Sequence, residues 1–85
     1  MKLNVLYFAG LRERMGRASE TLDVPAEVST VAALRAWLVA QGEPWASAFG
    51  ETARLRAAVD QAMARDDSAL SEGAEVAFFP PVTGG

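Results

Sequence analysis

The chain has 85 residues, enough for a single domain with one modest core, because a domain of this size hides only about 60–65% of the surface of its unfolded chain. Hydrophobic residues make up 51% of it and charged residues 22%, which is the composition of a folded globule. The net charge of −3 and the pI of about 4.8 argue against a nucleic-acid-binding protein, since no cluster of Lys and Arg is available to displace counterions from phosphates.

Two residue types that carry much protein chemistry are missing from the chain. It has no cysteine, which excludes disulfides, thiolate metal sites and a cysteine nucleophile. It has no histidine, which removes the Ser-His-Asp and Cys-His arrangements and the usual sets of zinc ligands. The adjacent carboxylates Asp66 and Asp67 have the surroundings of a turn rather than of a metal site. We therefore expect no bound metal and no catalysis by the chain alone.

No part of the sequence predicts export or membrane insertion. Its start lacks the basic and apolar regions of a signal peptide, and no apolar run approaches the ~18–20 residues of a membrane helix. We expect a cytoplasmic protein without membrane partners.

The first third of the chain predicts a β-hairpin. Residues 2–9 are rich in β-formers and, from Val5 onward, are apolar on both faces, as in a central strand that is covered on both sides. Residues 10–16 form a charged segment bounded by glycines, which predicts a turn. Residues 19–24 alternate polar and apolar side chains and predict the second strand.

The middle of the chain predicts one main helix. Ser29 or Thr30 can cap its start, and Gly42 stands where a glycine commonly ends a helix. The apolar residues at helical spacing, expected to face the core, are Val31, Leu34 and Leu38.

The second half predicts shorter elements. Residues 43–49 predict a helical turn that Gly50 breaks, with both of its aromatic residues packed against the domain. Residues 54–59 suit a strand or a helix by composition, and residues 66–73 have turn chemistry throughout. Residues 75–79 alternate cleanly and predict the last strand. The aromatic residues of the helical turn are Trp45 and Phe49.

These elements predict an α+β domain over residues 1–79, followed by a tail over residues 80–85. The order β-β-α-β-β, with one good helix against one sheet, is compatible with a β-grasp. In the last strand Phe79 falls on the face that Glu75 marks as exposed to water, whereas Phe78 falls on the other face.

The tail has a distinct chemistry. Pro80 and Pro81 lack amide donors and fix φ, so we expect the tail to leave the sheet in an extended path and to reach roughly 20 Å from the domain. Gly84 and Gly85 have no Cβ and could thread a narrow channel. The last group is a carboxylate, which as an acyl-adenylate could be attacked by a sulfur nucleophile to give a thiocarboxylate. An isolated Gly-Gly would be weak support for this chemistry, because chain termini are often disordered.

The longer string Glu75-Val-Ala-Phe-Phe-Pro-Pro-Val-Thr-Gly-Gly85 resembles the C-terminus of the molybdopterin synthase small subunits, which are ubiquitin-like sulfur carriers. The chain departs from the family at Asp60, usually Asn, and at Ala74, often Asp, both in turn regions. The resemblance also favours a strand over residues 54–59. Beyond the C-terminal string, the resemblance covers residues 5–9, 12–13, 30–35 and 57–61, and Gly73.

The resemblance implies a β-grasp protein that docks on two partners in turn. An ATP-dependent adenylating enzyme would activate the carboxylate of Gly85, which then becomes a thiocarboxylate. On the large subunit of molybdopterin synthase, two such carriers would convert a cyclic pyranopterin precursor into the dithiolene of molybdopterin. The ATP, the pterin and the metal would be held by the partners, so this chain binds no cofactor. The residues expected to enter the partners' active sites are Pro80, Pro81, Val82, Thr83, Gly84 and Gly85.

Three apolar residues are candidates for the docking surface. Phe79 ranks first because of its alternation, and Phe8 is as well suited to the core as to docking. Met63 joins them through the resemblance. Arg12 and Arg14 could contact acidic groups of a partner, although solvated arginines are more common and we do not place these two in the site.

Other functions share these features. A sulfur carrier for thiamine synthesis or tRNA thiolation would use the same Gly-Gly chemistry with another acceptor, although the Phe-Phe-Pro-Pro-Val-Thr segment favours the pterin pathway. A ubiquitin-like modifier would instead acylate a lysine of a target protein. A plain interaction domain with an inert tail is a third alternative.

Overall fold

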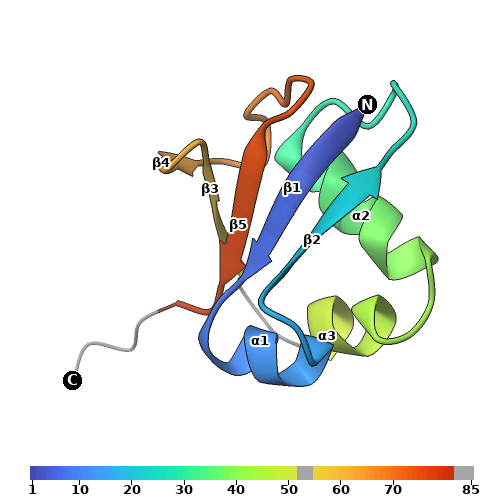
Figure 1. Ribbon diagram of the computed structural model, residues 1–85, viewed down its shortest axis with the longest axis vertical. Coiled ribbons are helices and arrows are strands. Elements are labelled where there is room, and N and C mark those ends of the chain that lie inside the picture. The colour runs from blue at the N-terminus through green and yellow to red at the C-terminus, as the bar shows by residue number, and fades with distance from the viewer. Residues whose placement is uncertain (52–54, 82–85) are drawn as a thin grey trace.

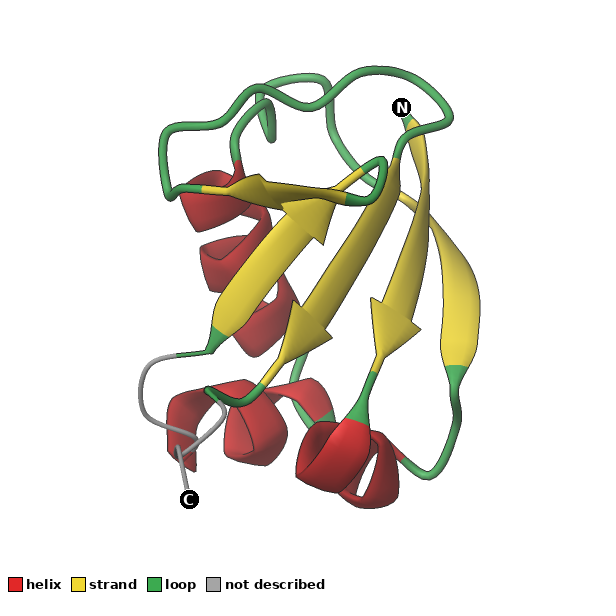
Figure 2. Cartoon of the chain, turned by 90° about the vertical axis from the view of Figure 1, so that its left-hand side faces the viewer, coloured by secondary structure: helices red, strands yellow, loops and turns green. Residues whose placement is uncertain are grey.

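The computed structural model describes residues 1–51 and 55–81. One mixed sheet packs against α2, while α1 and α3 lie at one end of the sheet (Figure 1 and Figure 2). Figure 2 shows α2 on one face of the sheet only. In chain order the elements are β1 (Lys2–Tyr7), α1 (Ala9–Met15), β2 (Ser19–Asp23), α2 (Val31–Ala40), α3 (Trp45–Glu51), β3 (Arg56–Val59), β4 (Ala62–Ala64) and β5 (Glu75–Phe79). The predicted α+β class is confirmed.

The sheet has five strands in the order β2-β1-β5-β3-β4. The first and last strands lie side by side at its centre and run parallel, with Val5 opposite Val76. The other neighbouring strands are antiparallel. The predicted hairpin pairing of residues 2–9 with residues 19–24 is confirmed, since Leu3 pairs with Leu22.

The prediction that β1 is covered on both faces was wrong. Leu3, Val5 and Tyr7 are buried, whereas Leu6 is only half-buried and Phe8, just beyond the strand, is exposed. Alternate residues of a strand point to opposite faces, so one face of β1 meets the core and the other meets no covering layer in the described part of the chain. The apolar residues on the second face therefore belong to the surface.

Residues 10–16, predicted as a turn, mostly form helix α1. Leu11 and Met15 are one helical turn apart, and both are buried in the core. The helix ends at Gly16, whose φ of 72° is easily adopted only by glycine and whose N–H donates to the carbonyl of Arg12. The charged residues between the two glycines concealed this apolar pair in the sequence.

The main helix was predicted correctly. The Oγ1 atom of Thr30 accepts a hydrogen bond from the N–H of Ala33 at 3.2 Å, which caps the start of α2. Gly42, with φ of 93°, follows the C-cap residue Gln41. The predicted core-facing residues are all fully buried: Val31, Leu34 and Leu38.

The short helical turn predicted over residues 43–49 begins and ends two residues later in the structure. It is the helix α3, and it continues through Gly50, so the predicted break at that residue was wrong. A glycine inside a helix costs about 1 kcal/mol relative to alanine, which the packing of the preceding residues can offset. Phe49 is buried and Trp45 packs against the core, as predicted.

The strand predicted over residues 54–59 is confirmed for residues 56–59, and Arg54 lies outside the described residues. The sequence did not predict β4, which pairs with β3 through a two-residue turn. Asp60 and Gln61 occupy that turn with φ of 49° and 69°, the left-handed values that a tight hairpin requires. The usual signal for such a turn is Asn-Gly or Asp-Gly, which is absent here.

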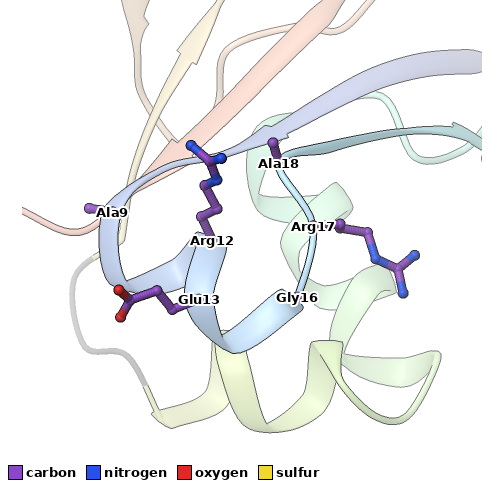
Figure 3. A pocket seen from close by; sticks show the side chains of 6 residues that line it. All are labelled: Ala9, Arg12, Glu13, Gly16, Arg17 and Ala18. Atoms are coloured by element: carbon purple, nitrogen blue, oxygen red, sulfur yellow. The ribbon is translucent and has the colours of Figure 1, made fainter.

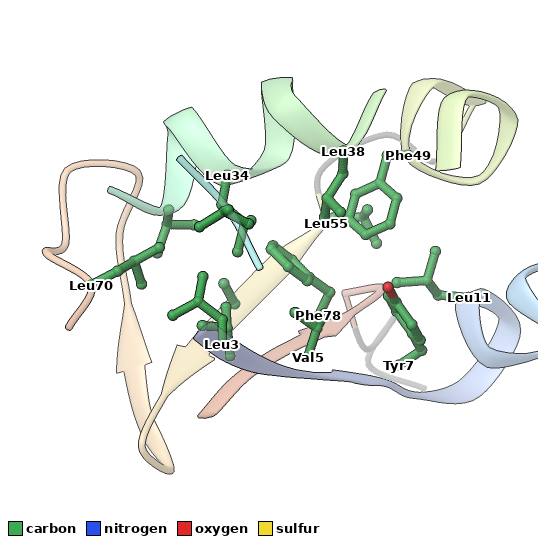
Figure 4. Packing of buried hydrophobic residues seen from close by; sticks show 14 of the residues in the cluster. Leu3, Val5, Tyr7, Leu11, Leu34, Leu38, Phe49, Leu55, Leu70 and Phe78 are labelled. Carbon is green, nitrogen blue, oxygen red and sulfur yellow. The ribbon is translucent and has the colours of Figure 1, made fainter. Parts of the chain in front are cut away.

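The core lies between the sheet and the three helices (Figure 4). Phe78 stands at its centre, and its ring meets the edge of Phe49 with centroids 5.0 Å apart and an interplanar angle of 85°. Tyr7 contacts Phe49 in a similar edge-on geometry. Among the described residues, no helix is long and apolar enough to cross a membrane.

Candidate functional site

The tail begins where β5 ends. β5 stops at Phe79, and Pro80 and Pro81 follow it without helix or strand structure. The N–H of Phe8 donates to the carbonyl of Phe78 at 3.1 Å, so the start of the tail lies beside the turn from β1 into α1. The remaining predicted tail residues lie outside the described residues: Val82, Thr83, Gly84 and Gly85.

The face of the sheet opposite α2, which we call the open face, carries the candidate docking residues. Strand pairing places Leu6 beside Ala77, Ala77 beside Ala58, and Ala58 beside Met63. These four residues form an apolar row across four strands. Phe79 lies on the same face, two residues along β5 from Ala77, because alternate residues share a face.

All three predicted docking residues lie at least partly exposed on the side of the molecule that the sheet forms. Their order of exposure differs from the order in which the sequence ranked them. Met63 is 63% exposed and Phe8 is 46% exposed, whereas Phe79, ranked first from the sequence, is only half-buried. Phe79 is paired with Arg56 of the neighbouring strand β3. Large exposed apolar side chains on one side of a sheet are typical of an interaction surface.

A depression of about 470 Å³ lies between α1 and the segment that leads into β2 (Figure 3). Arg12 extends from α1 toward the sheet, whereas Arg17 points away from it, so the two cations do not converge on one point. No sequence motif indicated this depression, and none of the predicted site residues lines it. Its lining residues are Ala9, Arg12, Glu13, Gly16, Arg17 and Ala18.

A partly buried polar cluster joins β1, β2 and α3. The hydroxyl of Tyr7 donates to Oε2 of Glu20 at 2.5 Å, and the indole N–H of Trp45 donates to the same oxygen at 3.1 Å. Arg17 donates to the other carboxylate oxygen at 2.9 Å. Burial, reinforced by the hydrogen bond to Glu20, raises the pKa of Tyr7 well above its usual range. The hydroxyl therefore stays protonated, and the cluster holds the elements together rather than moving protons.

The two adjacent carboxylates are paired with arginines. Asp66 lies 3.3 Å from Nη1 of Arg35, and Asp67 lies 3.6 Å from Nε of Arg65. The Oγ of Ser68 accepts a hydrogen bond from the backbone N–H of Arg65, as expected of a turn. No group of three or more metal-binding side chains occurs within residues 1–51 and 55–81.

Comparison with known proteins gives matches over almost the whole chain. The profile of the ThiS family matches residues 5–85. The molybdopterin synthase sulfur carrier subunit of Escherichia coli is 47% identical over 83 residues, which cover 98% of this chain and 99% of that protein. The protein of the same name from Haemophilus influenzae is 41% identical, with the same coverage.

Solved structures give the same fold. SAMP1 from Haloferax volcanii matches with a TM-score of 0.77 and 25% identity, covering 100% of both chains. The putative molybdopterin converting factor subunit 1 from Pyrococcus furiosus matches with a TM-score of 0.75 and 27% identity, covering 96% of this chain and 99% of that one. A complex of subunits 1 and 2 of the molybdopterin-converting factor from Helicobacter pylori contains a chain that matches with a TM-score of 0.64 and 19% identity, covering 100% of both chains.

These matches confirm the β-grasp fold predicted from the sequence, with its mixed sheet packed on one main helix. They also confirm the resemblance drawn from the C-terminal string and the shorter segments. Both curated relatives exceed 40% identity over nearly their full length, so the shared features extend well beyond the tail. The chain belongs to the ThiS family, as a relative of the molybdopterin synthase sulfur carrier subunits.

Proposed function

We propose that this chain is the sulfur carrier subunit of a molybdopterin synthase, and that its working group is the carboxylate of Gly85. The identity of 47% with a curated carrier subunit over 98% of the chain supports this proposal most strongly. The sequence also ends in the Gly-Gly on which the chemistry depends. We place the carrier and its partners in the cytoplasm.

The proposed chemistry has three steps, all at the terminal carboxylate. Attack of a carboxylate oxygen on the α-phosphorus of ATP gives an acyl-adenylate and releases pyrophosphate. A sulfide-level nucleophile supplied by a donor attacks the acyl carbon and displaces AMP, which leaves a thiocarboxylate. The thiocarboxylate sulfur then attacks an electrophilic carbon of the pterin precursor and displaces an oxygen leaving group, and hydrolysis of the acyl–sulfur bond returns the carboxylate of Gly85 and leaves the sulfur on the pterin. Two carriers supply the two sulfurs of the dithiolene.

The domain itself contributes recognition rather than catalysis. Its partly buried polar cluster is centred on Glu20, which already accepts hydrogen bonds from Tyr7, Trp45 and Arg17. The partners would therefore supply the ATP site, the pterin site and the catalytic groups. Pro80 to Gly84 would lie in the partners' clefts and deliver the carboxylate of Gly85 there.

The open face is the surface that we assign to the large subunit. Phe79 and Met63 lie on it, Phe8 lies beside it, and the tail leaves from the same end. The Helicobacter pylori complex of subunits 1 and 2 supports a large-subunit partner for a chain of this fold. Apolar anchors at the centre of an interface carry most of its binding energy, so these residues should dominate the affinity.

The first prediction concerns the mass of the intact protein. Incubated with ATP, its adenylating enzyme and a sulfur donor, the protein should gain the mass difference of one sulfur replacing one oxygen. The same mixture without ATP is the control and should leave the mass unchanged, because an unactivated carboxylate does not exchange oxygen for sulfur. A protein that is adenylated but never gains this mass would contradict the carrier function.

The second prediction concerns docking. Phe79→Arg should weaken binding to the large subunit by about tenfold or more, because it places a charge in a desolvated apolar contact. The matched control is Val39→Arg, since Val39 is an apolar residue of α2, 38% exposed, on the other side of the sheet. Titration calorimetry with the isolated large subunit measures both affinities. Equal affinities for the two variants would remove Phe79 from the interface.

A second candidate function is that of a ubiquitin-like protein modifier, favoured by the likeness to SAMP1, a small archaeal modifier protein. In that case the activated Gly85 would form an amide with a lysine of a target protein. Reconstitution separates the functions: sulfur transfer to the pterin precursor supports the first, and a lysine adduct found by mass spectrometry supports the second. A carrier for thiamine synthesis or tRNA thiolation would gain sulfur but would not convert the pterin precursor.

A further inference from the structure

The two ends of the open face carry opposite charges. Arg56 lies opposite Phe79 at the end where the tail begins, and Glu75 lies four residues earlier on β5, at the other end. Neither side chain forms a hydrogen bond or an ion pair with any other residue in the described part of the chain. Asp60 adds a second carboxylate beside Glu75, and its Oδ1 accepts a hydrogen bond from the backbone N–H of Glu75 at 3.0 Å.

The middle of the open face is uncharged and apolar. The row of Leu6, Ala77, Ala58 and Met63 crosses it from β1 to β4. Two of these four residues are alanines, so a partner surface can approach the strands closely there. Met63 projects furthest into solvent, at 63% exposure. This row divides the cationic end from the anionic end.

The charges are placed symmetrically about that row. On β3, Arg56 precedes Ala58 by two residues and Asp60 follows it by two, which places the α-carbons of Arg56 and Asp60 about 13 Å apart along an extended strand. A twofold axis along the row would bring a second copy face to face with the first and reverse the strand direction. Arg56 of each copy would then lie opposite Asp60 and near Glu75 of the other.

We propose that the free protein forms an antiparallel twofold dimer through its open face. We assign the open face to a second copy because it carries both the cationic and the anionic member of each ion pair. A surface that is complementary to itself in this way is what an isologous twofold interface requires. A twofold axis parallel to the strands would instead place Glu75 close to its own copy. The charges therefore select one of the two symmetric arrangements.

The other charged groups at each end leave this polarity in place. Arg12 of α1 adds a further cation near the end where the tail begins, and Glu13 of the same helix points away toward Ala9 (Figure 3). At the other end, Lys2 pairs in register with Asp23, and the carboxylate of Glu72 accepts a hydrogen bond from its backbone N–H. Carboxylates thus outnumber cations at the anionic end.

The dimer would compete with the proposed docking of the large subunit. It covers Phe79 and Met63, so a copy in the dimer cannot offer these residues to another protein. Self-association would shield exposed apolar surface while the carrier is free, and a tighter partner would displace the second copy. The dimer depends on the open face alone and not on sulfur chemistry, so it can be tested in the absence of ATP and of all partners.

Analytical ultracentrifugation of the full chain at concentrations up to about 1 mM tests the dimer. The wild-type mass should rise with concentration from 9.0 kDa toward twice that value. Arg56→Glu should weaken the dimer by at least about tenfold, because the like charges occur twice in a twofold interface. Glu75→Arg should do the same for the same reason.

A mixture of the two variants tests whether Arg56 of one copy faces the anionic end of the other. Arg56→Glu on one copy and Glu75→Arg on the other restore opposite charges at both ends, so the mixture should associate more strongly than either variant alone. This recovery also shows that both variants are folded. Val39→Glu is the control, since it adds a negative charge at an exposed residue of α2, on the other side of the sheet, and it should associate like the wild type.

Three results would overturn the dimer. The wild type could stay at 9.0 kDa over the whole concentration range. Arg56→Glu could associate as strongly as Val39→Glu, which would show that Arg56 forms no ion pair in the dimer. The mixture of the two charge variants could fail to associate while each variant shows a native circular dichroism spectrum, which would exclude the antiparallel arrangement.

Discussion

Removal of Gly85 is expected to abolish sulfur transfer while leaving the stability of the domain unchanged. The shortened chain still ends in a carboxylate, but that carboxylate would stop about 3.5 Å short of its normal reach. A misplacement of about 1 Å can already cost about a hundredfold in rate, so no activation by the adenylating enzyme should be detectable. The buried core cluster extends from Leu3 to Phe78, which is why the free energy of unfolding should not change.

Two measurements on the same sample check this expectation. Intact mass after incubation with ATP, the adenylating enzyme and a sulfur donor reports thiocarboxylate formation, and a denaturant titration reports stability. The full-length chain, treated identically, is the control. Thiocarboxylate on a chain that ends at Gly84, or molybdopterin formed with it, would show that Gly85 is not the working residue.

The largest effect on stability is expected from Phe78→Ala. Phe78 is fully buried, and its ring packs edge-on against Phe49 at a centroid distance of 5.0 Å. Replacement by alanine leaves a cavity and should lower the free energy of unfolding by about 3–5 kcal/mol. Small domains are typically stable by only about 5–15 kcal/mol, so the variant should be close to unfolded at physiological temperature.

Chemical denaturation followed by tryptophan fluorescence measures this loss, because Trp45 packs against the core. Phe79→Ala is the matched control: it removes the same ring from the next residue of β5, on the open face, and should cost much less. If both variants lost equal stability, the assignment of the two rings to opposite faces of the sheet would be wrong.

The features predicted well from the sequence depend on neighbours in the chain. The cap at Thr30 and the stripe through Leu34 lie within one helix, so their spacing alone was sufficient to locate α2. The alternation of β5 likewise separated Phe78 from Phe79. The chemistry of the tail was also inferred from local sequence, and it stays a prediction because Gly85 lies outside the described residues.

The features that were missed depend on what lies across the fold. Residues 10–16 looked like a turn because their apolar pair, Leu11 and Met15, is meaningful only once α1 meets the core. The exposure of Phe8 depends on which face of β1 is covered, and the sequence of residues 2–9, apolar on both faces, does not indicate which face that is. The opposite charges at the ends of the open face appear only when pairing brings Arg56 beside Phe79.

The central position of the two terminal strands has a consequence for how the protein is made. The parallel pairing of β1 with β5 is closed by hydrogen bonds between residues about seventy positions apart, such as Gly73 N–H to the carbonyl of Lys2. Such contacts form late in folding, because a long loop must close before they can contribute. A nascent chain that stops before β5 lacks the middle of its sheet and cannot complete the domain. Folding is thus coupled to the completion of synthesis, and prematurely terminated products should be left to proteases instead of occupying the partners without a reactive end.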